Sequence, residues 1–249
     1  MIKFFRQIRK SLVMDNKTTK YFKYAVGEIV LVIIGILIAL QINNWNENRK
    51  TIQKTNNYLR ALVTEIDKNV ITLSNAIEYV HADIEEAANS LKLLNLPQAI
   101  NYPDSTLKKA METRPIYKTI LSQSTFDDFI NAGILENIEE INLKNSILSI
   151  NSLIEDCYQN SKKSEDAWDN YQLPYLLQNN NVMANWDSIN NVKIYHTNFR
   201  IKREAFIQNF DYSNLLTLRM RMNGNYERQL LFTKEEFIKI SERIKKHLN

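Results

Sequence analysis

An unbroken run of apolar residues from Ile29 to Leu40 constrains the fold of this chain more than any other feature. With its flanks it forms the stretch YAVGEIVLVIIGILIALQI, residues 24–42. A helix of about 20 predominantly apolar residues is long enough to cross a hydrocarbon core of about 30 Å. The sequence therefore predicts a transmembrane helix over residues 24–42, and so a single-pass membrane protein.

A cleaved signal peptide is the alternative interpretation of an N-terminal apolar segment. Signal peptides have a short basic start, an apolar core of about 7–15 residues and small residues at the cleavage site. Here the basic start is much longer, and the core ends in Ala39-Leu40-Gln41-Ile42-Asn43, which has no A-x-A-like pattern. We therefore expect the segment to remain as an anchor.

The charges that flank the span predict its orientation. Seven lysines and arginines precede Tyr24 against a single acid, Asp15, whereas Glu47 offsets Arg49 and Lys50 after the span. Cationic flanks stay on the cytoplasmic side. Residues 1–23 are thus expected to form a basic, amphipathic cytoplasmic arm on anionic lipid headgroups, and residues 43–249 a periplasmic domain on the inner membrane. Nucleic-acid binding by the arm is not expected, because the span holds it at the bilayer.

Several residues at the ends of the span have the character of a membrane interface. The set comprises Lys20, Tyr21, Lys23, Tyr24, Glu28 and Trp45. Glu28 lies about one helical turn inside the cytoplasmic edge, where its carboxylate can reach the headgroups, and the tyrosines and Trp45 resemble the aromatic belts of the two interfaces. Gly35 and Ala39 form a small-xxx-small pair, a weak signal for close approach of two spans.

After the span, apolar residues recur in alternating steps of three and four. The series is Ile42, Trp45, Arg49, Ile52, Asn56, Leu59, Val63, Ile66, Val70, Leu73, Ile77, Val80, Ile84, Ala87, Leu91 and Leu94. Such a heptad seam predicts one long helix that ends near Leu96, because Pro97 cannot continue it. Two arrangements satisfy the seam, a parallel dimer or packing against later helices of the same chain. The second is favoured, since those helices also need apolar partners.

The rest of the chain also has helical spacing. We expect a helix over residues 122–132 that ends at Gly133, another capped by Asn142, and a long C-terminal helix over residues 213–247, divided in two by a capping box of Thr233 and Glu236. Four glycines and four prolines in 249 residues agree with an all-α chain. The predicted fold is a transmembrane helix that continues into a heptad-patterned helix packed in an extracytoplasmic helical bundle.

Two segments of the chain carry a family resemblance. The first is MIKFFRQIRKSLVMDNKTTKYFKYAVGEIVLVIIGILIALQINNWNE, the arm and the span. The second is STFDDFINAGILENIEEINLKNSI, which has the pattern of a helix, a glycine stop and another helix. Both are similar to recurring features of an uncharacterised single-pass membrane-protein family of Bacteroidota, domain-of-unknown-function family 6090. Together they bracket most of residues 1–145. The resemblance implies one N-terminal span and a helical external domain, and it supplies no catalytic residues.

The sequence offers no catalytic or metal-binding pattern, so an enzyme is not expected and no cofactor is implied. The three histidines lack Cys or His neighbours at zinc-ligand spacings, and glycine-rich phosphate loops are absent. Cys157 lies on a helical seam and is predicted to be a small buried residue. Arg219 and Arg221 are predicted to lie on a helix surface.

If a ligand surface exists, it is expected between residues 168 and 196. Aromatic and hydrogen-bonding groups gather there around an aperiodic, Asn-rich stretch: Trp168, Tyr171, Tyr175, Trp186, Asp187, Tyr195 and His196. The alternative is that these aromatics cap the end of a helical core.

Two functions therefore fit the sequence. The first is a structural or interaction module that associates with itself or with an envelope protein. The second is an extracytoplasmic sensor that signals through a separate membrane protein.

Overall fold

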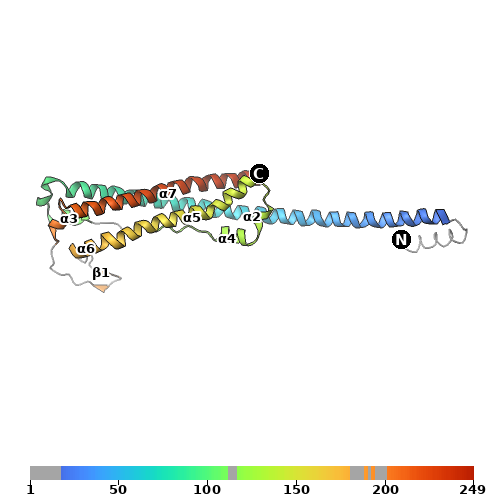
Figure 1. The fold of residues 1–249 in the computed structure, drawn as a ribbon, viewed down its shortest axis with the longest axis horizontal. Helices are drawn as coiled ribbons and strands as arrows, with labels where there is room; N and C mark the ends of the chain where they lie inside the picture. The colour runs from blue at the N-terminus through green and yellow to red at the C-terminus, as the bar shows by residue number, and fades with distance from the viewer. Residues whose placement is uncertain (1–17, 112–116, 180–187, 190–191, 194–200) are drawn as a thin grey trace. The chain divides into compact units, whose positions relative to one another are not determined.

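The computed structural model of the chain describes residues 18–111, 117–179, 188–189, 192–193 and 201–249. The structure is helical almost throughout, in agreement with the predicted all-α class (Figure 1). The long helices are α2 (Thr18–Leu94), α5 (Ile141–Ala167) and α7 (Phe210–Leu248). The shorter helices are α3 (Asp104–Met111), α4 (Ser124–Asn131) and α6 (Leu173–Asn179), with 3₁₀ turns at Pro97–Asn101, Ile134–Asn137 and Arg203–Ala205 and a π-helical turn, η3, at Trp168–Gln172. Two two-residue strands, β1 (Ser188–Ile189) and β2 (Val192–Lys193), pair antiparallel.

The chain divides into two compact units, residues 1–57 and 58–249. The described part of the first unit is the beginning of α2. Its apolar side chains are exposed, among them Ile29, Leu37 and Trp45. Within the described residues, α2 is the one helix long and apolar enough to cross a membrane, with a mean hydropathy of 2.6 in its most apolar window.

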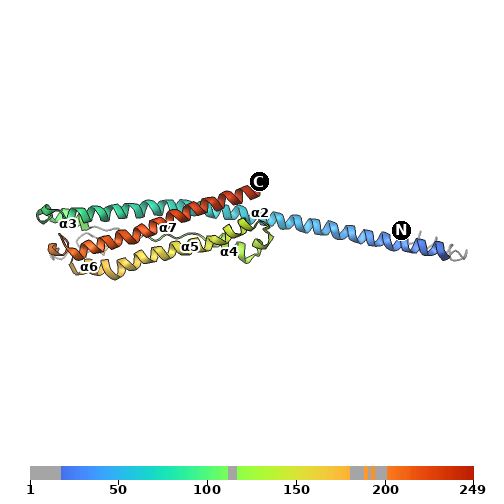
Figure 2. The same cartoon turned by 45° about the horizontal axis from the view of Figure 1, so that its top comes forward.

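The second unit is built around one face each of α2, α5 and α7. In Figures 1 and 2, α5 and α7 run alongside the part of α2 that belongs to this unit. Its larger core cluster takes side chains from all three helices and from α4, for example Leu73, Phe129, Ile147 and Phe237. A smaller cluster around Leu94, Leu107, Phe206 and Tyr212 closes the end where α2 finishes and α7 begins.

Side-chain hydrogen bonds show the direction of these helices. Along α2 and α7, Asp67 pairs with Lys245, Asp83 with Arg219 and Asn95 with Ser213. Partner numbers on α7 fall as those on α2 rise, so the two helices are antiparallel. Contacts of Ser146 with Arg243 and of Cys157 with Thr233 give the same relationship for α5 and α7.

The buried face of α2 differs from the predicted seam by one residue at every second position. Leu59, Ile66, Leu73, Val80, Ala87 and Leu94 are buried as the seam predicts. The predicted Val63, Val70, Ile77, Ile84 and Leu91 are only partly buried, and the residues just before them are buried instead: Leu62, Asn69, Ala76, Asp83 and Ser90. Three of these five are polar. A search for apolar spacing picks the apolar residue that follows each of these polar residues. In the fold the polar side chain is buried instead, because it has a hydrogen-bond partner.

Some of the predicted helix ends agree with the structure and others do not. Gly133 follows α4 with a φ of 67°, a left-handed conformation that glycine adopts without steric cost. However, α5 begins at Ile141 with Glu140 at its N-cap, so Asn142 is not the cap. The prediction that Thr233 divides the last helix is wrong: α7 is continuous from Phe210, and Thr233 is fully buried inside it. Asn209 caps α7 by accepting a hydrogen bond from the backbone N–H of Tyr212.

Candidate functional site

The structure describes three of the seven residues of the predicted ligand surface. Trp168 and Tyr175 are partly buried and pack against the smaller core cluster, whereas Tyr171 is exposed. Trp186, Asp187, Tyr195 and His196 lie outside the described residues. Among the described residues, the aromatics thus contribute mainly to the end of the helical core.

Tyr175 shows how these aromatics pack. Its ring stacks on Tyr212, with ring centroids 5.8 Å apart, and meets Phe206 edge-on at 6.0 Å. Its hydroxyl donates to the carbonyl oxygen of Ala205 at 2.6 Å. This arrangement joins α6 to the start of α7 and gives the hydroxyl of the partly buried Tyr175 a hydrogen-bond partner.

A buried ion pair lies beside Trp168. Arg219 on α7 donates from Nε to Asp83 Oδ2 at 2.9 Å and from Nη2 to Asp83 Oδ1 at 2.6 Å. Both side chains are at most 5% exposed. Asn223, one turn further along α7, also donates to Asp83, and the Arg219 guanidinium lies 5.0 Å from the ring centroid of Trp168. The prediction that Arg219 is surface is therefore wrong.

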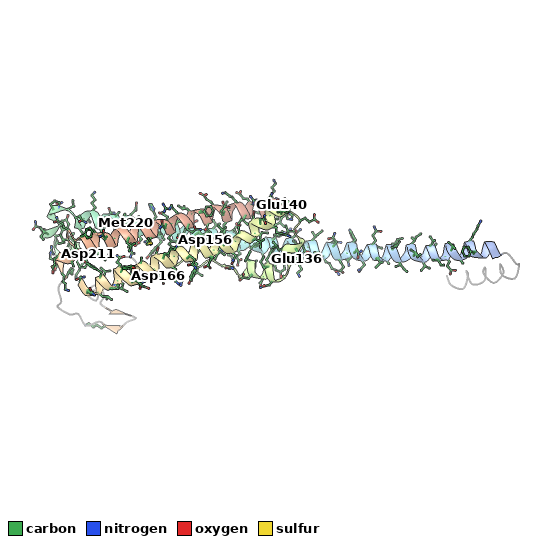
Figure 3. The ribbon with its side chains drawn as sticks, viewed as in Figure 1. Glu136, Glu140, Asp156, Asp166, Asp211 and Met220 are labelled. Carbon is green, nitrogen blue, oxygen red and sulfur yellow. The ribbon has the colours of Figure 1, made fainter. Side chains whose placement is uncertain are left out.

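Gln172 completes this polar group. Its side-chain oxygen accepts a hydrogen bond from Arg219 Nη1 at 3.3 Å, and the residue is 3% exposed. Gln172 is the last residue of η3, the π-helical turn. Such turns are rare and occur frequently at functional sites. We call Asp83, Gln172, Arg219 and Asn223 the buried polar network. Its place on α7 can be found in Figure 3 from the label of Met220, the residue that follows Arg219 in the sequence.

Sequence reasoning missed this network for a physical reason. Asp83 and Arg219 are 136 residues apart, and each is a charged residue, a type that is mostly exposed in folded proteins. The sequence did contain a signal in the position of Asp83. This residue continues a series with seven-residue spacing that includes Leu62 and Ala76, and that series runs three residues after the apolar series of Leu59, Ile66, Leu73 and Val80.

A second buried carboxylate, Glu65, holds the start of α4. Its two oxygens accept hydrogen bonds from the hydroxyls of Ser122 and Ser124 and from the backbone N–H groups of Thr125 and Phe126, at 2.6–3.1 Å. Burial raises the pKa of Glu65, but these hydrogen bonds outweigh it and leave the pKa below its usual 4.5. Ser124, Thr125 and Phe126 are the first residues of the second segment quoted above that contact Glu65, so Glu65 holds the start of that segment in place.

Asn69, one turn after Glu65, reinforces the same attachment. Its side-chain amide donates to the backbone oxygen of Ser122 at 2.7 Å, and its oxygen accepts from the Ser122 N–H at 2.8 Å. A two-way amide contact of this kind satisfies the backbone of a segment that is in neither a helix nor a strand.

Two hollows lie among the described residues of the second unit. A cavity of about 10 Å³ adjoins the buried polar network. An open groove of about 760 Å³ lies between the start of α5 and the last turns of α7, near Glu140 in Figure 3. Polar side chains alone line the groove: Glu140, Asn142, Lys239, Glu242, Arg243, Lys246 and His247. It lacks the apolar walls typical of small-molecule sites.

The predicted interface and packing residues of the first unit all lie on α2. Trp45 is exposed, with the Arg49 guanidinium 6.0 Å from its ring centroid. Gly35 and Ala39 are exposed, and a Cβ added at Gly35 would meet nothing within 4 Å. Lys23 is exposed and Glu28 partly buried, whereas the side chains of Lys20, Tyr21 and Tyr24 lie outside the described part.

The Cys157 thiol is buried within the described part of the chain. Burial raises the pKa of the Cys157 thiol to about 11, and the thiol contacts the hydroxyl of Thr233 at 3.2 Å. No group of three or more His, Cys, Asp or Glu residues there could hold a metal ion.

No family model, curated protein or solved structure matches the chain. The resemblance to the Bacteroidota family therefore remains a prediction from the two segments quoted above.

Proposed function

We propose that the chain is a membrane-anchored helical module that acts outside the cytoplasmic membrane through structural or protein–protein contacts. The observation that carries this proposal is the composition of α2. This one helix contains both the apolar stretch and, from Tyr58 onward, a face that contributes to the core of the second unit. A helix with these two parts suits an anchor for a folded domain.

The excess of positive charge before the span supports an N-terminus in the cytoplasm. The second unit then lies in the periplasm, attached to the inner membrane. Alkaline phosphatase fused after Asn249 keeps the whole chain intact and is active only outside the cytoplasm. We expect an active fusion, and a green fluorescent protein fusion at the same place should be dark. A stable, inactive phosphatase fusion together with a fluorescent partner fusion would reverse the proposed topology.

We further propose that the heptad-patterned part of α2 packs as one member of a helical bundle within its own chain. The core cluster that it shares with α5 and α7 supports this arrangement, as do the hydrogen bonds that Asp67 and Asp83 accept from α7. The small-xxx-small pair Gly35 and Ala39 then remains available for association of two spans.

The two hollows described above favour an interaction role over a sensor of small molecules. Small-molecule sites typically enclose about 300–1,000 Å³ between largely apolar walls. The cavity beside the buried polar network has about 10 Å³, and the large groove is open and lined by polar groups. Two aromatic residues of the expected ligand surface, Trp168 and Tyr175, are used in packing.

Affinity purification after chemical crosslinking in cells tests the interaction role. The bait is the full chain, and the matched control is residues 1–57, which keep the arm and the span but lack the second unit. A partner, or a second copy, that is recovered with the full chain and lost with the control supports the proposal. Equal recovery by both baits, or a full chain that stays monomeric and uncrosslinked, contradicts it.

A further inference from the structure

The side-chain amide of Gln172 has a fixed orientation. Arg219 carries only donors, so the group of Gln172 that faces it must be the oxygen, as the 3.3 Å contact from Arg219 Nη1 shows. The amide nitrogen Nε2 therefore points away from the guanidinium. It is buried and has no hydrogen-bond partner among the described residues.

An unpartnered amide nitrogen at this depth is costly. Leaving a buried donor without a hydrogen bond costs about 1–3 kcal/mol, and most such groups in folded proteins are satisfied by protein or by ordered water. Gln172 is 3% exposed, so bulk solvent does not supply the acceptor.

The cavity beside the network has the size and lining of a water site. Its volume is about 10 Å³, close to the room that one water molecule needs. Gln172 lines it together with Ser164 and Asn223, whose side chains carry oxygens that can accept hydrogen bonds. Trp168 and Met222 provide apolar walls.

We propose that this cavity is a binding site for one internal water molecule, which accepts a hydrogen bond from Gln172 Nε2 and donates to side-chain oxygens of α5 and α7. Ser164 is the α5 residue at the cavity whose side chain carries an oxygen. The water thus links α5 to the Asp83–Arg219 pair and connects all three long helices through one polar group. The π-helical turn serves this site by placing Gln172 at its edge.

A double-mutant cycle in the full chain, solubilised in detergent, distinguishes a hydrated cavity from a dry one. Ala167 also lines the cavity, so Ala167→Val adds two methyl groups where the water would lie. If water is bound, this change displaces it, strands the Gln172 amide and lowers Tm by a few degrees. In a Gln172→Met background, which has nearly the same side-chain volume and no amide, the same change should leave Tm unchanged or raise it.

An equal effect of Ala167→Val in both backgrounds would overturn the proposal, because steric strain or simple filling does not depend on the amide. Water-¹⁷O magnetic relaxation dispersion gives an independent reading. We expect Ala167→Val to bind one long-lived water molecule fewer than the wild type. An unchanged number of long-lived water molecules contradicts the site.

Discussion

Arg219 and Asp83 meet through two hydrogen bonds, at 2.9 and 2.6 Å, between buried positions on α7 and α2. The planar guanidinium fork fits the carboxylate in one geometry, so the pair matches one alignment of the two helices and opposes any slip along the apolar face. Replacing a buried pair by apolar residues is often neutral for stability, whereas removing one partner is costly. We therefore expect the pair to specify the register of the two helices more than it adds stability.

We predict that Asp83→Ala lowers the free energy of unfolding by about 3–5 kcal/mol, because it removes the carboxylate that pairs with the buried Arg219 cation. Urea unfolding of the detergent-solubilised chain, followed by circular dichroism, measures this change. The double variant Asp83→Leu, Arg219→Met should recover most of the loss. Lys245→Ala is the control, since its pair with Asp67 is about half exposed and such pairs contribute at most about 1 kcal/mol. A cost for Asp83→Ala no larger than the control contradicts the role given to the pair.

Glu65 predicts the acid sensitivity of the second unit. Its folded pKa lies below the unfolded value of 4.5, so its contribution to stability is complete above pH 4.5 and is lost as the pH falls through the folded pKa. Protonation removes an acceptor from Ser122, Ser124 or the start of α4. Glu65→Gln should lower stability at neutral pH and flatten the decline of Tm below pH 4.5.

The control for this test is Asp128→Asn, an exposed acid on α4. It should shift Tm little at either pH and leave the slope unchanged. If Glu65→Gln and wild type lose stability in parallel between pH 5 and pH 3, the four hydrogen bonds of Glu65 do not have the proposed effect.

The helices of this chain could be predicted because their signals are local. Proline at 97, glycine at 133 and sustained apolar spacing indicate where helices lie. The exact buried face of α2 could not be read in this way. At positions 69, 83 and 90 the buried residue is polar, and each has an apolar neighbour at the next position that fits the seam as well. The choice depends on partners such as Ser122 and Arg219, which are distant in the sequence.

The candidate site shows the same limit. Aromatic enrichment drew attention to Trp168 and Tyr175, and both lie beside the buried polar network or the smaller core cluster. Their role in packing depends on α7, whose approach no local pattern reveals. The π-helical turn at Trp168–Gln172 has no sequence signature, so the position of Gln172 could not be predicted.

Cys157 is predicted to be inert in the folded protein. Burial raises its pKa to about 11, so at pH 8 very little thiolate is present and access is blocked. Iodoacetamide should modify it only after denaturation, as measured by intact-mass spectrometry. The control is Ser152→Cys in a Cys157→Ala background, an exposed position on the same helix, which should react in the native state. Rapid native modification of Cys157 contradicts its burial.

The last prediction separates packing within one chain from packing between two chains. Leu73 is fully buried on α2, whereas Ile71, two residues earlier, is 63% exposed. Leu73→Asp puts an unpaired charge into the core of the second unit and should lower Tm strongly, because such a loss reaches several kcal/mol. If α2 packs against α5 and α7 of its own chain, the mass of the detergent-solubilised protein in sedimentation equilibrium should not change. Ile71→Asp should alter neither quantity. A Leu73→Asp variant that keeps its Tm and turns a dimer into a monomer would instead place this face between two chains.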